Sequence, residues 1–221
     1  MEKKAIILGI TGLTGTVLAK QLFEDDEYTE VISFHRRKSG LENPKLTEHV
    51  VDLFELEKEK ARFNADVVFC CIGTTQAKTE DKEMYKAIDY GIPLQAAQLC
   101  KVNGIDTFVA ISALGADAQS RIFYNRTKGE MQRDILKLAI KNSYFMQPAL
   151  LAGERKDNRT GESIAIRALK IINPILLGPL RKYRSIKPAK IAKTMRFVAK
   201  NGYKKSLIES DEIQQIAHEN A

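Results

Sequence analysis

The stretch that decides the fold is Gly9-Ile10-Thr11-Gly12-Leu13-Thr14-Gly15, which directly follows the apolar run Ala5-Ile6-Ile7-Leu8. A short, continuous apolar run is typical of a strand that is buried on both faces of a parallel sheet. After such a strand, the first glycine permits a tight turn, the second lets the backbone approach a pyrophosphate, and the third lets the next helix pack closely. Free amides at the start of that helix attract the anion. The candidate contacts are Gly9, Thr11, Gly12, Leu13, Thr14 and Gly15.

The chain then repeats the order of strand, turn and helix. Further apolar runs predict strands at Val31–Phe34, His49–Asp52, Val67–Ile72, Thr107–Ile111 and Tyr144–Gln147. Segments with helical spacing lie between them, at Leu53–Phe63, Lys82–Cys100 and Tyr124–Lys141. Strands that alternate with helices of this length imply right-handed crossovers and a parallel sheet. We therefore expect an α/β fold with a doubly wound parallel sheet of the Rossmann type.

The tail after Pro148 has a different pattern. It begins with a polar stretch, continues through helical segments at Ser163–Ile172 and Ala189–Lys200, and includes a candidate strand at Ser206–Glu209. We find no internal repeat and no linker of low complexity, so we expect one domain over residues 1–221. Residues 151–221 are expected to form a small cap region that contributes the substrate-side elements.

The composition favours an ordinary globular protein. The chain has 221 residues, of which 44% are hydrophobic, and a formal net charge of +7. Its basic residues are mixed with acids, which predicts a solvated surface rather than a nucleic-acid site. No apolar stretch approaches the roughly 18 residues of a membrane span, and the cysteines and histidines fit neither a disulfide framework nor a zinc site. We therefore expect a soluble, cytoplasmic monomer or homodimer that binds no membrane, nucleic acid or metal.

The residues after the second strand predict which dinucleotide is bound. An NAD site usually carries an acid about 20 residues beyond the glycines, bonded to the ribose 2′-hydroxyl. Here the sequence reads Phe34-His35-Arg36-Arg37-Lys38-Ser39, without an acid. A guanidinium binds a 2′-phosphate through two parallel hydrogen bonds, whereas a carboxylate repels it. The sequence therefore predicts NADP(H), with Arg36 or Arg37 as the phosphate ligand and Ser39 as a helper.

Two other strand ends carry candidate cofactor contacts. Asp52 ends the third predicted strand beside Leu53, where it either accepts from the adenine amino group or caps the helix that follows. Gly73, Thr74 and Thr75 end the fourth strand, on the ligand side of the sheet. Their backbone is expected to pass close to the cofactor ribose.

A reactive set is predicted around the fifth strand. Tyr124 and Lys128 are four residues apart at the start of a helix, so they share one helical face. The ammonium of Lys128 is expected to favour proton transfer by the Tyr124 hydroxyl near neutral pH. Ser112 ends the preceding strand, where its hydroxyl is expected to bond the oxygen of a substrate carbonyl.

Together these residues carry a resemblance to the atypical branch of the short-chain dehydrogenase/reductase superfamily, in the group of the Tat-interacting tumour-suppressor protein and its bacterial relatives. The glycine motif is the first matching stretch. The others are Cys71-Ile72-Gly73-Thr74-Thr75, Ile111-Ser112-Ala113-Leu114-Gly115-Ala116-Asp117, Tyr124–Glu130 and Gln147-Pro148-Ala149-Leu150-Leu151-Ala152-Gly153-Glu154-Arg155. The resemblance covers most of the chain and adds Pro148 to the candidate cofactor contacts.

The resemblance implies a catalytic set of Ser112, Tyr124 and Lys128, in which Lys128 also bonds the nicotinamide ribose. A fourth member, usually Asn, corresponds here to Asp89, which alters the charge near Lys128. The expected function is reduction of a small carbonyl compound by hydride transfer from NADPH. The alternative is an NADP(H)-binding regulator or redox sensor without catalytic activity, which acts through a protein partner.

Overall fold

The computed structural model describes residues 2–149 and 178–219, which form one seven-stranded sheet with every strand parallel to its neighbours. The strand order is β3-β2-β1-β4-β5-β6-β7, so the direction of winding reverses between β1 and β4. This order confirms the Rossmann-type sheet. The strands are β1 (Lys3–Leu8), β2 (Tyr28–His35), β3 (Leu46–Val50), β4 (Val67–Cys70), β5 (Thr107–Ile111), β6 (Asn142–Gln147) and β7 (Leu207–Glu209).

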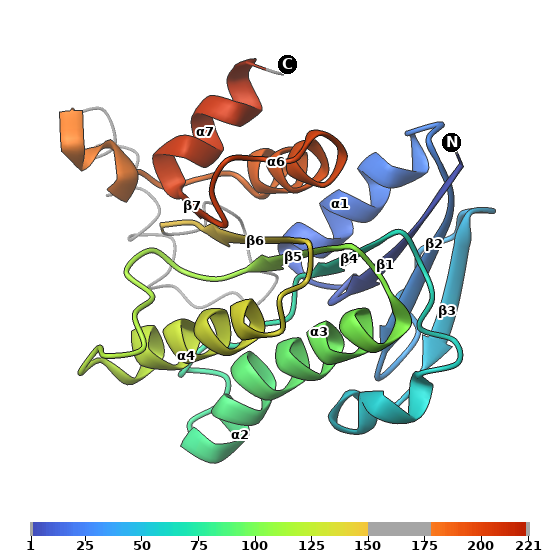
Figure 1. Cartoon of the computed structure of the whole chain (residues 1–221), viewed down its shortest axis with the longest axis horizontal. Helices are drawn as coiled ribbons and strands as arrows, with labels where there is room; N and C mark the ends of the chain where they lie inside the picture. The colour runs from blue at the N-terminus through green and yellow to red at the C-terminus, as the bar shows by residue number, and fades with distance from the viewer. Residues whose placement is uncertain (1, 150–177, 220–221) are drawn as a thin grey trace.

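Helices cover both faces of the sheet (Figure 1). The upper layer in Figure 1 consists of α1 (Leu13–Phe23), α6 (Pro188–Asn201) and α7 (Ser210–Glu219). The lower layer consists of α2 (Lys82–Lys86), α3 (Ile92–Asn103) and α4 (Phe123–Lys137). Of two short 3-10 segments, η1 (Leu53–Glu59) packs against α3 and η4 (Gly178–Tyr183) packs against α7.

Alternating strand residues supply two hydrophobic cores, one on each face. Ile7 and Phe69 belong to the core shared with α1 and α6. Leu8 and Val68 belong to the core shared with α3 and α4. Because successive side chains of a strand point to opposite faces, a continuous apolar run fills both cores at once.

Two predicted elements differ from the observed ones at the exposed edge of the sheet. The third strand is Leu46–Val50 rather than His49–Asp52, and most of its residues are only partly buried. An edge strand of this kind lacks the continuous apolar run that marks the central strands. The predicted helix Leu53–Phe63 is a 3-10 segment that is interrupted by non-helical dihedral angles at Glu55.

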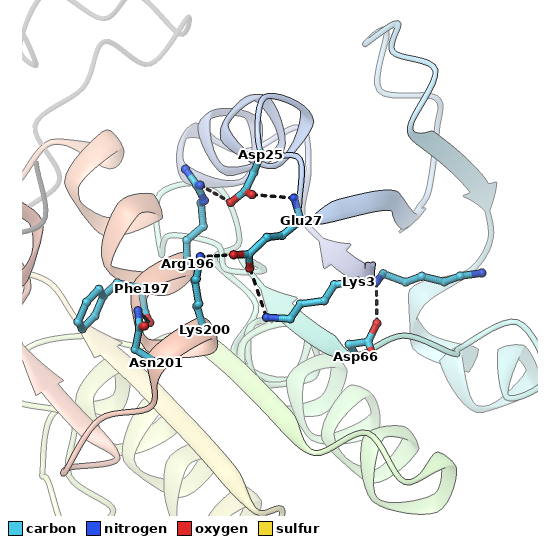
Figure 2. A network of polar contacts seen from close by, with 9 residues as sticks. Lys3, Asp25, Glu27, Asp66, Arg196, Phe197, Lys200 and Asn201 are labelled. Atoms are coloured by element: carbon cyan, nitrogen blue, oxygen red, sulfur yellow. Dashed lines mark hydrogen bonds and ion pairs between the residues drawn. The ribbon is translucent and has the colours of Figure 1, made fainter. Parts of the chain in front are cut away.

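An ion-pair network docks α6 at the amino ends of the strands, opposite the glycine motif (Figure 2). Arg196 of α6 contacts Asp25 at 2.5 Å, and Lys200 pairs with Glu27. Glu27 also accepts from Lys3 of β1 at 3.5 Å. The network joins α6 to the first βαβ unit at the edge where no ligand is expected.

The described part of the expected cap region belongs to the main sheet. Residues 207–209 pair with β6, and α6 packs against α1. Residues 151–177 and 220–221 of the expected cap, and with them the predicted helix Ser163–Ile172, lie outside the described residues.

Candidate active and cofactor-binding site

The three glycines of the motif differ in what surrounds them. Gly9 has a φ of +83°, and a Cβ there would lie 2.8 Å from the carbonyl of Cys71. A Cβ on Gly15 would lie 2.1 Å from the Gly9 oxygen. At Gly12, by contrast, the nearest atom is the Gly9 oxygen at 3.2 Å, and the residue is exposed. Packing therefore requires glycine at the first and third positions, whereas the second leaves its outer side open to a ligand.

The start of α1 fits the diphosphate of a dinucleotide. Gly12 is the N-cap residue and provides no side-chain cap, and the first turn contains no acid. The amides of a first helical turn have no intrahelical acceptor, and the helix dipole adds positive potential at this end. The open side of Gly12 leads directly to these amides. Among the other candidate contacts, Thr11 is exposed, Leu13 is partly buried and Thr14 is 4% exposed.

Arg36 and Arg37 follow β2 at the same edge of the sheet, and both are exposed. Within the described residues, neither forms a salt bridge. Ser39 is more constrained, since its amide donates to Glu48 Oε1 at 2.9 Å and its hydroxyl accepts from the Leu41 amide at 3.1 Å. Of these candidates, the guanidinium groups of Arg36 and Arg37 are therefore the ones available to bind a 2′-phosphate.

Asp52 caps the segment that follows it, one of the two roles left open by the sequence. Its Oδ1 accepts from the Phe54 amide at 2.9 Å, and the residue itself is exposed. The neighbouring Leu53 is 5% exposed and contributes its side chain to the core. Only the backbone of Leu53 is thus available to a nucleotide.

A buried ion pair joins the helical segment that precedes α3 to helix α4, and the loop after β4 bonds to it. Lys128 Nζ lies 2.7 Å from Asp89 Oδ1, and the two side chains are 4% and 1% exposed. The other carboxylate oxygen of Asp89 accepts from the Thr74 amide at 2.7 Å. A Cβ on Gly73 would lie 3.5 Å from the carboxylate and 3.7 Å from the ammonium. The loop Gly73–Thr75 therefore passes directly over the charged pair and covers it.

An irregular helix brings Asp89 into this position. A π-helical turn, η2 (Ala87–Gly91), separates α2 from α3, and Asp89 lies at its centre with no exposed surface. Turns of this kind widen a helix locally and occur frequently at functional sites. The sequence predicted one regular helix here, since a π turn leaves no clear mark on apolar periodicity.

The charge balance keeps Lys128 in its ammonium form. Burial lowers the pKa of Lys128, but the negative charge of Asp89 and the Tyr124 oxygen outweigh this effect, so the pKa is raised overall. Tyr124, one turn earlier in α4, is partly buried and packs edge-on against Tyr85 with ring centroids 6.4 Å apart. The helix thus places Tyr124 and Lys128 in the electrostatic contact expected from their spacing.

Ser112 lies in a buried polar chain that the sequence analysis missed. Gln132 Nε2 donates to Ser112 Oγ at 2.5 Å, and Gln132 Oε1 accepts from Gln147 Nε2 at 3.3 Å. All three side chains are at most 5% exposed. Since Ser112 accepts in this chain, its own proton remains available to a further acceptor. The signal in the sequence was the position of Gln132, one turn after Lys128 on the same helical face.

The remaining candidates frame the site. Thr74 Oγ1 bonds Thr79 Oγ1 at 2.9 Å, and the carbonyl of Thr75 accepts from the Thr79 amide at 2.9 Å. The carbonyl of the buried Pro148 accepts from the Leu114 amide at 3.0 Å, which ties the end of β6 to the loop after β5.

Within residues 2–149 and 178–219, no helix has the length and apolarity to cross a membrane, and no cluster of three or more metal-ligating side chains is present.

The sequence is similar to a known protein family and to named proteins. The NAD(P)H-binding family matches residues 9–145, from the glycine motif into β6. The chain is 33% identical to "Protein FMP52-1, mitochondrial" of Scheffersomyces stipitis over 160 residues, 70% of each chain. It is 32% identical to "Protein HTATIP2" of Rattus norvegicus over 168 residues, which cover 74% of this chain and 69% of the relative.

Solved structures share the fold at low sequence identity. UDP-glucose 4-epimerase of Thermotoga maritima, solved with UDP-glucose, has a TM-score of 0.70 and 13% identity, over 98% of this chain and 82% of its own. The enzyme WbmG of Bordetella bronchiseptica, solved with NAD, has a TM-score of 0.69 and 10% identity, over 100% and 78%. At these identities the likeness demonstrates the fold alone.

The comparisons also correct one expectation and establish the family. The cytoplasmic location expected from the sequence is contradicted by the FMP52 relatives, which are named as mitochondrial proteins. The nicotinamide cofactor expected from the glycine motif agrees with the matched family. With a family match over more than half of its length and relatives above 30% identity, the chain belongs to the NAD(P)H-binding family, within the atypical group of the short-chain dehydrogenase/reductase superfamily.

Proposed function

We propose that this protein is an NADP(H)-dependent reductase that acts on a small carbonyl compound. The proposal is supported by Lys128, whose Nζ lies 3.5 Å from the carbonyl oxygen of Ile111, the residue before Ser112, and which interacts electrostatically with Tyr124. Strand β5 ends here at the carboxyl edge of the sheet, the edge at which the glycine turn opens. In this proposal the whole chain, 1–221, acts as one domain, and residues 151–221 complete the substrate side.

Each member of the set has a separate task in the proposed reaction. NADPH, when bound at the glycine turn, would supply the hydride that the carbonyl carbon accepts. Tyr124 donates its phenolic proton to the carbonyl oxygen, and the Ser112 hydroxyl donates a hydrogen bond to that same oxygen. Lys128 holds the nicotinamide ribose and supplies positive charge beside Tyr124, while Asp89 positions Lys128.

The preference for NADP(H) is assigned to the guanidinium groups after β2. Arg36→Glu is expected to weaken NADPH binding at least about tenfold more than NADH binding, because it replaces a phosphate ligand with a repelling charge. Arg37→Glu is the matched variant, equally exposed and adjacent in sequence. Calorimetry with both nucleotides decides the assignment: an unchanged preference in both variants would remove it.

Tyr124→Phe tests the proposed chemistry. The variant keeps the aromatic ring that packs against Tyr85 and removes only the proton donor. We expect NADPH oxidation with a panel of carbonyl compounds to fall by at least about a hundredfold, with an unchanged dissociation constant for NADPH. Equal loss of turnover and nucleotide binding would contradict the role given to Tyr124.

One observation favours a second candidate, an NADP(H)-binding regulator or redox sensor without turnover that acts through a protein partner. The carboxylate of Asp89 lies 2.7 Å from the Lys128 ammonium and compensates its charge. A compensated ammonium stabilises a Tyr124 phenolate less than a free one does. NADPH uptake without Tyr124-dependent oxidation of any carbonyl substrate would favour this candidate, and clear turnover would exclude it.

A further inference from the structure

The two arginines proposed to bind the 2′-phosphate lie at the start of the loop between β2 and β3. Arg36 and Arg37 are exposed and directly follow His35, the last residue of β2. The loop runs to Leu46, where β3 begins at the edge of the sheet (Figure 1). A loop and long side chains that a ligand must immobilise lose conformational entropy, and this loss weakens binding. The affinity for a phosphate here therefore depends on how firmly the loop is held before the nucleotide binds.

A carboxylate from the neighbouring strand holds this loop. Glu48 of β3 accepts from the Ser39 amide at 2.9 Å through Oε1, two residues beyond Arg37. On the other side of the arginines, the carbonyl of His35 accepts from the Val51 amide at 3.0 Å. The chain is thus bonded to β3 and to the residue after it on both sides of the arginine pair. Of the two bonds, only the one to Glu48 depends on a side chain.

The carboxylate of Glu48 is ionised at neutral pH. Burial raises the pKa of Glu48. Hydrogen bonding from Ser39 lowers this pKa, as do His35 and Lys38, and together they outweigh burial. A hydrogen bond to an ionised acceptor is about twice as strong as one between neutral groups. Glu48 is therefore a stronger acceptor for the loop amide than a neutral side chain in the same place.

The ring of His35 packs against this carboxylate. Its side chain is 6% exposed, and its Nε2 lies 3.3 Å from Glu48 Oε1. Burial and His49 lower the pKa of His35 by more than Glu48 raises it, so the ring is uncharged at neutral pH. Neither ring nitrogen has a hydrogen-bond partner within the described residues. The ring therefore lies beside the carboxylate without competing with the Ser39 amide for it.

Glu48 also lies near the place where an NAD site carries its acid. That acid usually follows the glycines by about 20 residues and bonds the ribose 2′-hydroxyl, and His35 stands at this position. Glu48 brings a carboxylate to within 3.3 Å of His35 from the next strand. Its side chain is only 18% exposed, and Oε1 already accepts from Ser39. These contacts favour a role in holding the loop over a role as a ribose ligand.

We propose that Glu48 is a positioning residue for NADP(H) selectivity, which acts through the Ser39 amide to hold the loop that presents Arg36 and Arg37 to the 2′-phosphate. NADH has no 2′-phosphate, so its binding does not draw on this contact. The inference rests on the proposed function, because it needs the arginines as the phosphate ligands.

Calorimetry of the full chain with NADPH and with NADH tests this role in three variants of Glu48. Glu48→Ala is expected to weaken NADPH binding by about fivefold to tenfold and NADH binding by less than about twofold. Glu48→Gln keeps an acceptor oxygen at the same reach, so it is expected to retain NADPH affinity within about threefold. Glu48→Asp keeps the charge but shortens the side chain, so it is expected to behave like Glu48→Ala. The contrast between Asp and Gln carries the test if the alanine variant does not fold.

A matched control and a direct measurement of the contact accompany the binding data. Glu30→Ala removes another partly buried carboxylate between the same two strands, which accepts from Thr47 Oγ1 at 2.9 Å, and is expected to change the affinity for neither nucleotide. Hydrogen exchange of the Ser39 amide, followed by NMR without nucleotide, is expected to be about tenfold faster in Glu48→Ala and Glu48→Asp than in the wild type.

The outcomes separate this inference from the proposed function. Equal weakening of NADPH and NADH, or an unchanged ratio of their affinities in Glu48→Ala and Glu48→Asp, would overturn the inference. Weaker NADH with unchanged or tighter NADPH in Glu48→Gln would also overturn it, because Glu48 would then be a ribose ligand. A preference that responds to Arg36→Glu or Arg37→Glu but not to Glu48 refutes this inference alone. A preference that responds to neither arginine removes the cofactor assignment and the inference together.

Discussion

Asp89→Asn is the perturbation for which the structure gives the sharpest expectation. The Lys128 ammonium and the Asp89 carboxylate are 2.7 Å apart, with side chains only 4% and 1% exposed. Breaking a buried ion pair by removal of one partner costs about 3–5 kcal/mol, because the other charge stays desolvated. An asparagine oxygen still accepts from the ammonium, which recovers about 1 kcal/mol. We therefore expect the free energy of unfolding to fall by about 2–4 kcal/mol at neutral pH.

The pH dependence of this loss distinguishes electrostatics from packing. In the wild type, burial lowers the pKa of Lys128, but Asp89 and Tyr124 together outweigh this effect and raise it, so the pair stabilises the fold below the ordinary lysine value of 10.5. In Asp89→Asn no carboxylate opposes the effect of burial, and the buried amine releases its proton at a lower pH than in the unfolded chain. The unfolded state then binds more protons than the folded variant, so stability rises with pH. The deficit is expected to shrink by about 1 kcal/mol between about pH 7 and 9.

Urea unfolding followed by circular dichroism at the two pH values measures this effect. Asp106→Asn is the matched control, since the Lys141–Asp106 pair has an N–O distance of 3.2 Å but side chains 71% and 63% exposed. The control should change stability by less than about 0.5 kcal/mol. A loss below about 1 kcal/mol in Asp89→Asn, or a loss that is the same at both pH values, would refute the reasoning.

Three further predictions follow from other contacts. Gly15→Ala should lower the free energy of unfolding by about 3 kcal/mol or more, because its Cβ would lie 2.1 Å from a backbone oxygen. Gly12→Ala, with its nearest contact at 3.2 Å, should fold but bind NADPH more weakly. Thermal unfolding and calorimetry test the two expectations, and a stable Gly15→Ala protein would contradict the first. Gln132→Glu should lower carbonyl turnover about tenfold without weakening NADPH binding, because a carboxylate accepts the Ser112 proton. Steady-state kinetics across pH should show that turnover recovers in acid, where the carboxylate is protonated. A turnover rate that does not change with pH would contradict this explanation. For Asp25, burial raises the pKa, but the Glu27 amide and Arg196 outweigh this and lower it overall. Asp25→Asn should therefore cost about 1 kcal/mol above the ordinary value of 3.8, and the difference should fade as pH falls below it; acid titration of unfolding measures this, and a difference that persists in acid would disprove it.

Local patterns in the sequence were sufficient for the fold class. Apolar runs that are buried on both faces can be identified residue by residue, as for Val67–Cys70 at the centre of the sheet. The glycine turn could be predicted because its three glycines directly follow such a run, although the close contact of Gly9 with the carbonyl of Cys71 joins two separate segments of the chain. The edge strand Leu46–Val50 was misplaced because partial exposure on both faces removes the pattern on which the prediction depends.

The site was only partly accessible from the sequence. The spacing of Tyr124 and Lys128 fixes their common helical face, because a helix has one periodicity. The family resemblance placed the charge of Asp89 near Lys128. The direct ion pair between the two, which needs the π turn, and the bond from Gln132 to Ser112 depended on contacts between separate elements. Such contacts join segments that are far apart in the chain, so their energies depend on packing that no local pattern encodes. The sequence by itself determined the parallel sheet and its phosphate-binding turn, and tertiary structure alone decided the charge and hydrogen-bond balance of the reactive groups.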